Sequence, residues 1–191
     1  MRKNICVYCG ASEGILPIYA EQARYLGQLI AQQGRRLIYG GGNRGLMGII
    51  ANAVLEHGGE VYGIIPHKLV IAETAHTGIT TLDIVNDMPT RKARMMELAD
   101  AFIAMPGGTG TLEELFEAWT ATQIGYHAKP LSLFNIEHFY DPLLQYLAHS
   151  AQHGFIRPAF LRTLQVSSTA ETLLTLLDEY QPTDLERWKK A

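Results

Sequence analysis

The chain has 191 residues, with 16 lysine or arginine against 19 aspartate or glutamate, so its net charge is −3. This length is typical of one domain, and a composition of 47% apolar and 18% charged residues excludes a disordered chain. The charge supplies no general attraction for nucleic acid or an anionic membrane, and no apolar run approaches the ~18 residues of a membrane span. We therefore expect a cytoplasmic globular protein that binds neither nucleic acid nor membrane.

Strand and helix patterns alternate along the whole chain. Short apolar, β-branched runs predict strands, and apolar residues every three or four positions predict helices. The least regular segment is 66–78, where we expect a surface loop. The expected strands span 4–10, 35–42, 60–65, 80–85, 101–105, 129–135 and 164–167, and the expected helices span 19–30, 46–54, 90–99, 112–124, 139–153 and 169–180.

This alternation predicts the fold class. Strands that are apolar almost throughout, with helices between them, indicate a parallel sheet covered on both faces. The expected fold is α/β, a Rossmann-like doubly wound parallel sheet. No repeat, low-complexity tract or linker divides the chain, so we expect a single domain over 1–180 and a polar C-terminal tail over 181–191.

Neither the cysteines nor the histidines form a recognisable reactive site. A redox C-x-x-C motif needs its first thiol at a helix N-terminus, whereas Cys6 and Cys9 lie in or at the end of the first predicted strand. We interpret both cysteines as structural. The seven histidines lack the spacing of a metal site, so we expect no metal, and we interpret His127 as a hydrogen-bonding loop residue.

Three glycine-rich turns lie where predicted strands end and helices begin. Such turns let backbone N–H groups approach a phosphate, and the helix N-terminus adds favourable potential for an anion. None has the spacing of a dinucleotide fingerprint or a Walker A loop, which favours a mononucleotide bound without metal or cofactor. The turns span 9–14, 40–45 and 106–111, and we expect the second and third, with Gly41 and Gly42 in the second, to face one pocket.

Arg91 and Lys92 follow Pro89 near the predicted start of a helix. Cations at this position oppose the helix dipole by about 0.3–1 kcal/mol each, so they need an anion nearby. A bound phosphate would supply one. The alternative is a basic face that pairs with Glu97 or a neighbouring carboxylate.

Glu114 has two interpretations. Thr111 and Glu114 have the T-x-x-E spacing of a capping box, in which the glutamate only accepts a backbone hydrogen bond. The spacing by itself favours this cap. The position of the helix beside a phosphate-binding turn favours a further task for the carboxylate.

At these residues the sequence resembles the LOG family of cytokinin-activating phosphoribohydrolases, many of which were formerly labelled lysine decarboxylases. The resemblance rests on PGGTGTLEE over 106–114, on the Arg91-Lys92 pair, and on GGG over 40–42 followed by GLMG over 45–48. It implies hydrolysis of the N-glycosidic bond of N6-modified adenosine 5′-monophosphates to the free base and ribose 5-phosphate. It also implies a homodimer.

The resemblance places the catalytic roles on Arg91 and Glu114. Glu114 would stabilise oxocarbenium-like charge on the ribose and orient or deprotonate water. Arg91 would either anchor the phosphate or assist departure of the purine, and the sequence leaves both open. The implied substrate contacts are Glu73, Lys92, Gly108, Thr109, Gly110, Thr111, Leu112, Glu113 and Thr120.

The chain departs from the family pattern at three places. Pro89-Thr90 replaces the usual His-Glu, and Thr109 replaces a usual aromatic residue. The GGG turn continues with Asn43-Arg44 rather than the common small and apolar pair. These departures bear on pocket shape and base specificity more than on the reaction.

Two other functions fit parts of the pattern. A non-catalytic nucleotide or molybdenum-cofactor carrier would share the glycine turns, although Arg91 together with Glu114 argues for catalysis. A decarboxylase would need a lysine that forms a Schiff base with pyridoxal phosphate, and none of the six lysines has a recognisable context for it. We expect no cofactor, and we expect turnover to require the 5′-phosphate.

Overall fold

Seven parallel strands form one sheet in the computed structural model, which describes residues 1–71 and 74–182. The strands are β1 (Asn4–Tyr8), β2 (Arg36–Tyr39), β3 (Glu60–Pro66), β4 (Thr81–Val85), β5 (Ala101–Ala104), β6 (Leu131–Phe134) and β7 (Leu164–Ser167). Their spatial order is β4-β3-β2-β1-β5-β6-β7. At the centre of the sheet, Val7 lies between Tyr39 of β2 and Ile103 of β5.

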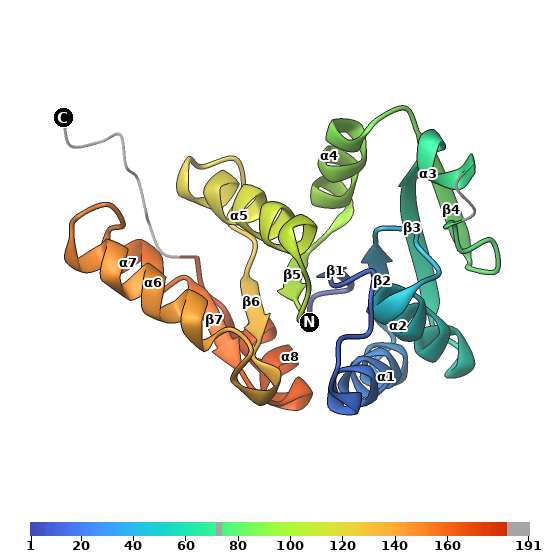
Figure 1. Cartoon of the computed structure of the whole chain (residues 1–191), viewed down its shortest axis with the longest axis horizontal. Helices are drawn as coiled ribbons and strands as arrows, with labels where there is room; N and C mark the ends of the chain where they lie inside the picture. Colours follow the sequence, from blue (N-terminus) through green and yellow to red (C-terminus); the bar gives the residue numbers. More distant parts are fainter. Residues whose placement is uncertain (72–73, 183–191) are drawn as a thin grey trace.

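Helices cover both faces of the sheet (Figure 1). One face carries α1 (Pro17–Gln32), α2 (Gly45–Glu56) and α8 (Ala170–Glu179), and the other carries α4 (Met88–Leu98), α5 (Thr109–Gln123), α6 (Asp141–Gln152) and the short α7 (Pro158–Leu161). The side chains of β1 alternate between two buried clusters, with Ile5 and Val7 in one and Cys6 and Tyr8 in the other. Burial on both faces is the reason that the strand is apolar throughout.

The strand order creates a switch point beside β1. From β1 the chain builds outward to β4 at one edge, and α4 then carries it back across β3, β2 and β1 to β5 on the other side of β1. The turns that follow β1 and β5 therefore lead to helices on opposite faces of the sheet. In open parallel sheets, ligands bind in the crevice at the carboxyl ends of such strands.

The predicted fold class is confirmed, and all seven predicted strands form. The surface loop predicted over 66–78 is wrong in its first half, because Pro66 ends β3 and α3 (His67–Ile71) follows at once. A helix of five residues is too short to show a periodic pattern. The short α7 and the 3₁₀ helix η1 (Ile136–His138) were not predicted for the same reason.

Two further expectations concern the C-terminal tail and membrane-spanning segments. Most of the polar tail predicted over 181–191 lies outside the described residues. None of the helices in the described ranges combines the length and the apolar composition that a membrane crossing requires.

Candidate active site

A pocket of about 590 Å³ opens at the carboxyl ends of the central strands. Residues from all three glycine-rich turns line it. The prediction that the second and third turns face one pocket is confirmed, and the first turn faces the same pocket. The lining residues from these turns are Cys9, Gly10, Ala11 and Ser12 after β1, Gly40, Gly42 and Arg44 after β2, and Gly108, Thr109, Gly110 and Thr111 after β5.

The turns after β1 and β5 are packed directly against each other. Gly10 N–H donates to the carbonyl of Pro106 at 3.1 Å. A Cβ on Gly107 would lie 2.1 Å from Oγ1 of Thr111, so only glycine fits there. Gly108 and Gly110 differ, because a Cβ on either would meet nothing within 4 Å. The open side of this turn faces the pocket.

The turn after β2 is held by the chain segment that follows α3. Asn43 N–H donates to the carbonyl of Thr74 at 2.8 Å, and His76 N–H donates to the carbonyl of Gly41 at 2.9 Å. Thr74 also lines the pocket. Glu73, a predicted substrate contact, lies outside the described residues.

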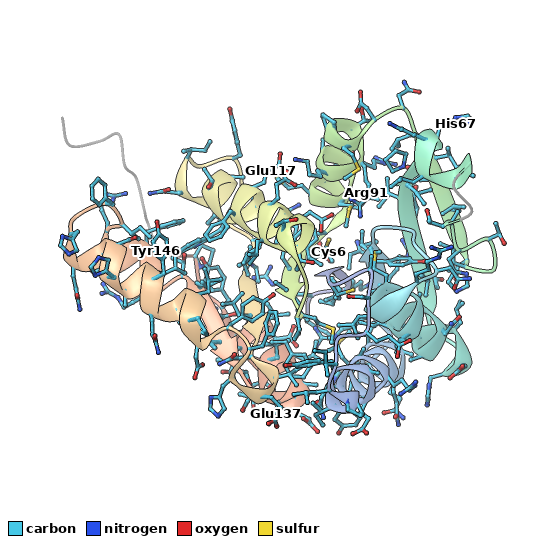
Figure 2. The ribbon with its side chains drawn as sticks, in the orientation of Figure 1. Cys6, His67, Arg91, Glu117, Glu137 and Tyr146 are labelled. Atoms are coloured by element: carbon cyan, nitrogen blue, oxygen red, sulfur yellow. The ribbon has the colours of Figure 1, made fainter. Side chains whose placement is uncertain are left out.

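Arg91 reaches the pocket from the buried face of α4. The helix begins where the carboxylate of Asp87 accepts from Thr90 N–H at 2.8 Å. One turn on, the Arg91 guanidinium is buried, donates from Nε to the carbonyl of Ile64 at 3.1 Å, and places Nη1 2.8 Å from Oε1 of Glu114. Figure 2 shows Arg91 on the sheet side of α4, near the ends of the central strands.

Close packing fixes the guanidinium of Arg91. A Cβ on Gly40 would lie 1.9 Å from Nη2 of Arg91, so the glycine turn after β2 leaves the room that the guanidinium occupies. Arg91 thereby contacts β3, the β2 turn and α5 at once. The anion that its helix position requires is the carboxylate of Glu114. This agrees with the alternative in which the cation pairs with a neighbouring carboxylate. Arg91 is buried, however, and does not lie on a solvated face.

Glu114 is not part of a capping box. Helix α5 begins at Thr109 with Gly108 as its N-cap, three residues earlier than the predicted start at Leu112. Thr111 is therefore the third helical residue, and Glu114 is the sixth, beyond reach of the cap. Burial raises the pKa of the Glu114 carboxyl above its usual range, because the loss of water outweighs the opposing effect of the Arg91 charge.

The other predicted site residues are distributed around this pair. Gly42, Gly108, Thr109, Gly110, Thr111 and Glu113 line the pocket together with Arg91 and Glu114, whereas Gly41, Lys92, Leu112 and Thr120 do not. Lys92 forms ion pairs with Glu113 and, at 3.1 Å, with Glu117, and its pKa is raised by the bond to Glu113. Thr120 lies in a separate apolar groove between α4 and α5.

Sequence reasoning missed the apolar wall of the pocket. The wall consists of Met47 of α2, Ile65 of β3, Leu69 of α3 and Met88 of α4. The sequence indicates a helix for Met47, a strand for Ile65, a surface loop for Leu69 and a helix start for Met88, and none of these patterns points to a shared wall. Only the return of α4 across the sheet brings Met88 to the same pocket as Met47.

The interpretations of Cys6, Cys9 and His127 are borne out. Cys6 and Cys9 are free and buried, and burial raises the pKa of both thiols, so the structural interpretation is confirmed. Nδ1 of His127 accepts from Lys129 N–H at 3.2 Å and lies 3.2 Å from the Thr122 hydroxyl, while burial lowers the pKa of His127 to about 4. In the part of the chain that the structure describes, no three His, Cys, Asp or Glu side chains are grouped as metal ligands.

The chain is similar to known proteins in sequence and in fold. Residues 47–177 match a family model described as "possible lysine decarboxylase". A cytokinin riboside 5′-monophosphate phosphoribohydrolase of Rhodococcoides fascians is 50% identical over 158 residues, which cover 82% of this chain and 80% of that protein. One from Arabidopsis thaliana is 43% identical over 180 residues, or 94% of this chain and 83% of that protein.

The fold is shared with a protein named for a different ligand. The molybdenum cofactor binding protein from the phototrophic bacterium Rippkaea orientalis superimposes with a TM-score of 0.70 at 25% identity. The match covers 93% of this chain and 97% of that chain. The two kinds of relative therefore share one scaffold, and the chemistry of the pocket must distinguish them.

Proposed function

Since the chain belongs to the LOG family of cytokinin riboside 5′-monophosphate phosphoribohydrolases, we propose that it hydrolyses the N-glycosidic bond of adenosine 5′-monophosphate and its N6-modified derivatives. The products are the free purine base and ribose 5-phosphate. The protein is thus a nucleotide N-glycosyl hydrolase, and its relatives carry the name phosphoribohydrolase.

One observation carries this proposal beyond the family. The carboxylate of Glu114 is buried beside the Arg91 guanidinium in a pocket that also holds the glycine turn at the start of α5. Cleavage of a ribosyl bond builds positive charge on the sugar, and a carboxylate in a water-poor site stabilises that charge more than it would in water. A carrier has no need for such a group.

The bond changes follow from this arrangement. The C1′–N9 bond breaks, its electron pair leaves with the purine, and the ribose acquires oxocarbenium character that Glu114 stabilises. Glu114 then orients a water for attack at C1′ and accepts its proton. The departing base takes up one proton from solvent, and Glu114 returns its proton to solvent after the products form. Arg91 keeps Glu114 ionised and fixed in position through the ion pair.

The remaining lining residues fit the other parts of the nucleotide. The first N–H groups of α5, from Thr109 to Thr111, lack a side-chain cap and are suited to the 5′-phosphate. The apolar wall of Met47, Ile65, Leu69 and Met88 suits the purine. Lys92 acts through Glu113 and Glu117. Gly41 and Leu112 adjoin lining residues without lining the pocket, Thr120 lies in the groove between α4 and α5, and Glu73 stays a predicted contact.

A homodimer in the cytoplasm completes the proposal. The groove between α4 and α5 has a volume of about 610 Å³ and exposes apolar side chains, among them Ile124 and Tyr126. A second copy of the chain would cover these side chains.

The test is an assay for base release. The purified protein is incubated with AMP or with N6-isopentenyl-AMP, and free base and ribose 5-phosphate are measured. Equimolar release of both products is expected, with adenosine a far poorer substrate. Tight binding without release would favour the carrier alternative. A pyridoxal phosphate decarboxylase is disfavoured, because no lysine is among the described residues that line the pocket.

A further inference from the structure

Arg44 is a cation at the pocket without a partner. Among the residues that the structure describes, two arginines line the pocket, Arg44 and Arg91. Arg91 is engaged by Glu114 and by the carbonyl of Ile64. The exposed side chain of Arg44 forms no ion pair or hydrogen bond with any residue in the described ranges.

Arg44 carries the one positive charge in the described lining that no carboxylate offsets. The charged residues in that lining are Arg44, Arg91, Glu113 and Glu114. Glu114 pairs with Arg91, and Glu113 pairs with Lys92, so each carboxylate already has a cation. Arg44 therefore leaves one guanidinium free to pair with a phosphomonoester, which brings about −1.5 to −2 charge at neutral pH.

The backbone of Arg44 is rigid although its side chain is free. A Cβ on Gly45, with φ of 57°, would lie 2.3 Å from the backbone of Ala11, and a Cβ on Gly48 would lie 2.6 Å from the Asn43 carbonyl oxygen. The hydrogen bond from Asn43 N–H to Thr74 holds the other side of the turn. The backbone of Arg44 therefore stays in place beside the pocket, and only the side chain can reorient.

Helix α2 gains nothing from an arginine at this position. Arg44 is the N-cap residue of α2, makes no capping hydrogen bond, and places a positive charge at the positive end of the helix dipole. Serine or asparagine would stabilise the helix start better. An arginine that weakens its own helix and lacks a partner is explained by a role toward a ligand.

We propose that Arg44 binds the 5′-phosphate of the substrate from the side of the pocket opposite α5, and that Arg91 does not. This assignment rests on the proposed function and states which of the two arginines binds the phosphate. Arg44 thereby sets the preference for nucleotide over nucleoside. Arg91 serves the carboxylate of Glu114.

The test compares Arg44→Ser and Arg44→Lys with Arg24→Ser, which removes an exposed arginine from α1 outside the pocket. For AMP, Arg44→Ser should raise KM about ten- to a hundredfold and leave kcat within about threefold, as expected for loss of one charge-assisted contact to phosphate. Arg44→Lys should recover part of the loss, because it restores the charge without the bidentate fork. Arg24→Ser should match wild type.

Two further readouts separate this role from a structural one. The thermal midpoint of Arg44→Ser should equal or exceed that of wild type, because serine caps α2. The slow release of base from adenosine, which has no phosphate, should not change. An unchanged KM for AMP in a folded Arg44→Ser protein, or an equal loss with AMP and adenosine, would overturn the proposal.

A binding measurement keeps the proposal separate from the proposed function. Calorimetric titration with ribose 5-phosphate needs no turnover. Arg44→Ser should weaken its binding by the same factor as it raises KM for AMP. If no nucleotide releases a base, the proposed function fails, whereas the ribose 5-phosphate titration still decides whether Arg44 binds phosphate.

Discussion

At the residue scale, the buried ion pair between Arg91 and Glu114 is the central feature. Burial of two charges costs solvation that their mutual attraction only partly returns, so such a pair is weak support for stability. Because the pair lies in the pocket, we relate it to catalysis rather than to stability. Burial favours the protonated form of the Glu114 carboxyl and raises its pKa, and the Arg91 charge opposes that effect.

The raised pKa of Glu114 predicts the pH dependence of catalysis. If the ionised carboxylate is required, kcat for AMP should fall as pH drops through this raised pKa, at higher pH than for an ordinary glutamate. Removal of the Arg91 charge removes an effect that lowers this pKa. The acid limb of the kcat profile should therefore move to higher pH in Arg91→Gln, and less in Arg91→Lys.

The substrate phosphate titrates in the same way whether the enzyme is wild type or Arg91→Gln. A difference between the two kcat profiles therefore comes from the enzyme. An acid limb at the same pH in wild type and Arg91→Gln would show that another group controls it. The free energy of unfolding depends on pH in the opposite direction to kcat. A raised carboxyl pKa means that the folded state favours the protonated form. The stability from this group is present below its unfolded pKa and lost as pH rises through the folded one.

The sequence predicted the right residue types at this scale but could not predict their partners. The T-x-x-E spacing suggested a cap for Glu114, whereas its partner Arg91 lies on another helix. The pairing of Lys92 with Glu113 and Glu117 is also between helices. Contacts of this kind depend on how α4 and α5 are placed, and no local pattern encodes that.

At the element scale, the start of α5 is the feature that departs most usefully from expectation. The sequence predicts a turn at Thr109 and Gly110, yet they are the first helical residues of α5. Gly110 is neither in a left-handed conformation nor crowded, so the fold itself does not require glycine there. An approaching ligand explains why a side chain is absent.

Gly110→Ala should therefore stabilise the protein and weaken substrate binding. Alanine in place of a helical glycine raises the free energy of unfolding by about 0.5–1 kcal/mol. The added methyl group should raise KM for AMP and weaken ribose 5-phosphate binding. Gly58→Ala is the matched control, because Gly58 also has open space but has a φ of 74° and lies outside the pocket lining.

The control should show the reverse pattern. Gly58→Ala should lower the thermal midpoint and leave KM unchanged, since alanine is strained at that φ. A Gly110→Ala protein that is more stable and binds as well as wild type would contradict a phosphate site at α5.

Long elements were predictable and short ones were not. The strands and the helices of ten or more residues carry enough apolar positions to show their period, and each was predicted near its observed place. Helices α3 and α7, with five and four residues, show no period. The loop predicted after β3 consequently hid Leu69, which forms part of the apolar wall.

At the scale of the whole molecule, the strand order gathers the site. The turns after β1, β2 and β5 are far apart in the sequence and meet because β1 and β5 are neighbours across the switch point. The sequence predicted a doubly wound sheet but not this order. The order matters because it brings α4, and with it Arg91, over the end of β3.

The proposed homodimer is tested at the same scale. Light scattering at micromolar concentration should give twice the mass of the chain. Ala93 is exposed in the groove between α4 and α5, so Ala93→Arg should place a charge there without disturbing the core and should yield a monomer. A wild-type mass of one chain would refute the dimer, and a dimeric Ala93→Arg protein would place the interface elsewhere.

The catalytic assignment of Glu114 is tested most directly by the rate of adenine release from saturating AMP in the Glu114→Gln protein. Glutamine keeps the shape of the side chain and an oxygen near Arg91, so the thermal midpoint and KM should change little. Loss of the charge should reduce kcat by about 10²-fold or more, the scale of one electrostatic or general-base contributor. A folded Glu114→Gln protein that releases adenine at nearly the wild-type rate would contradict the account.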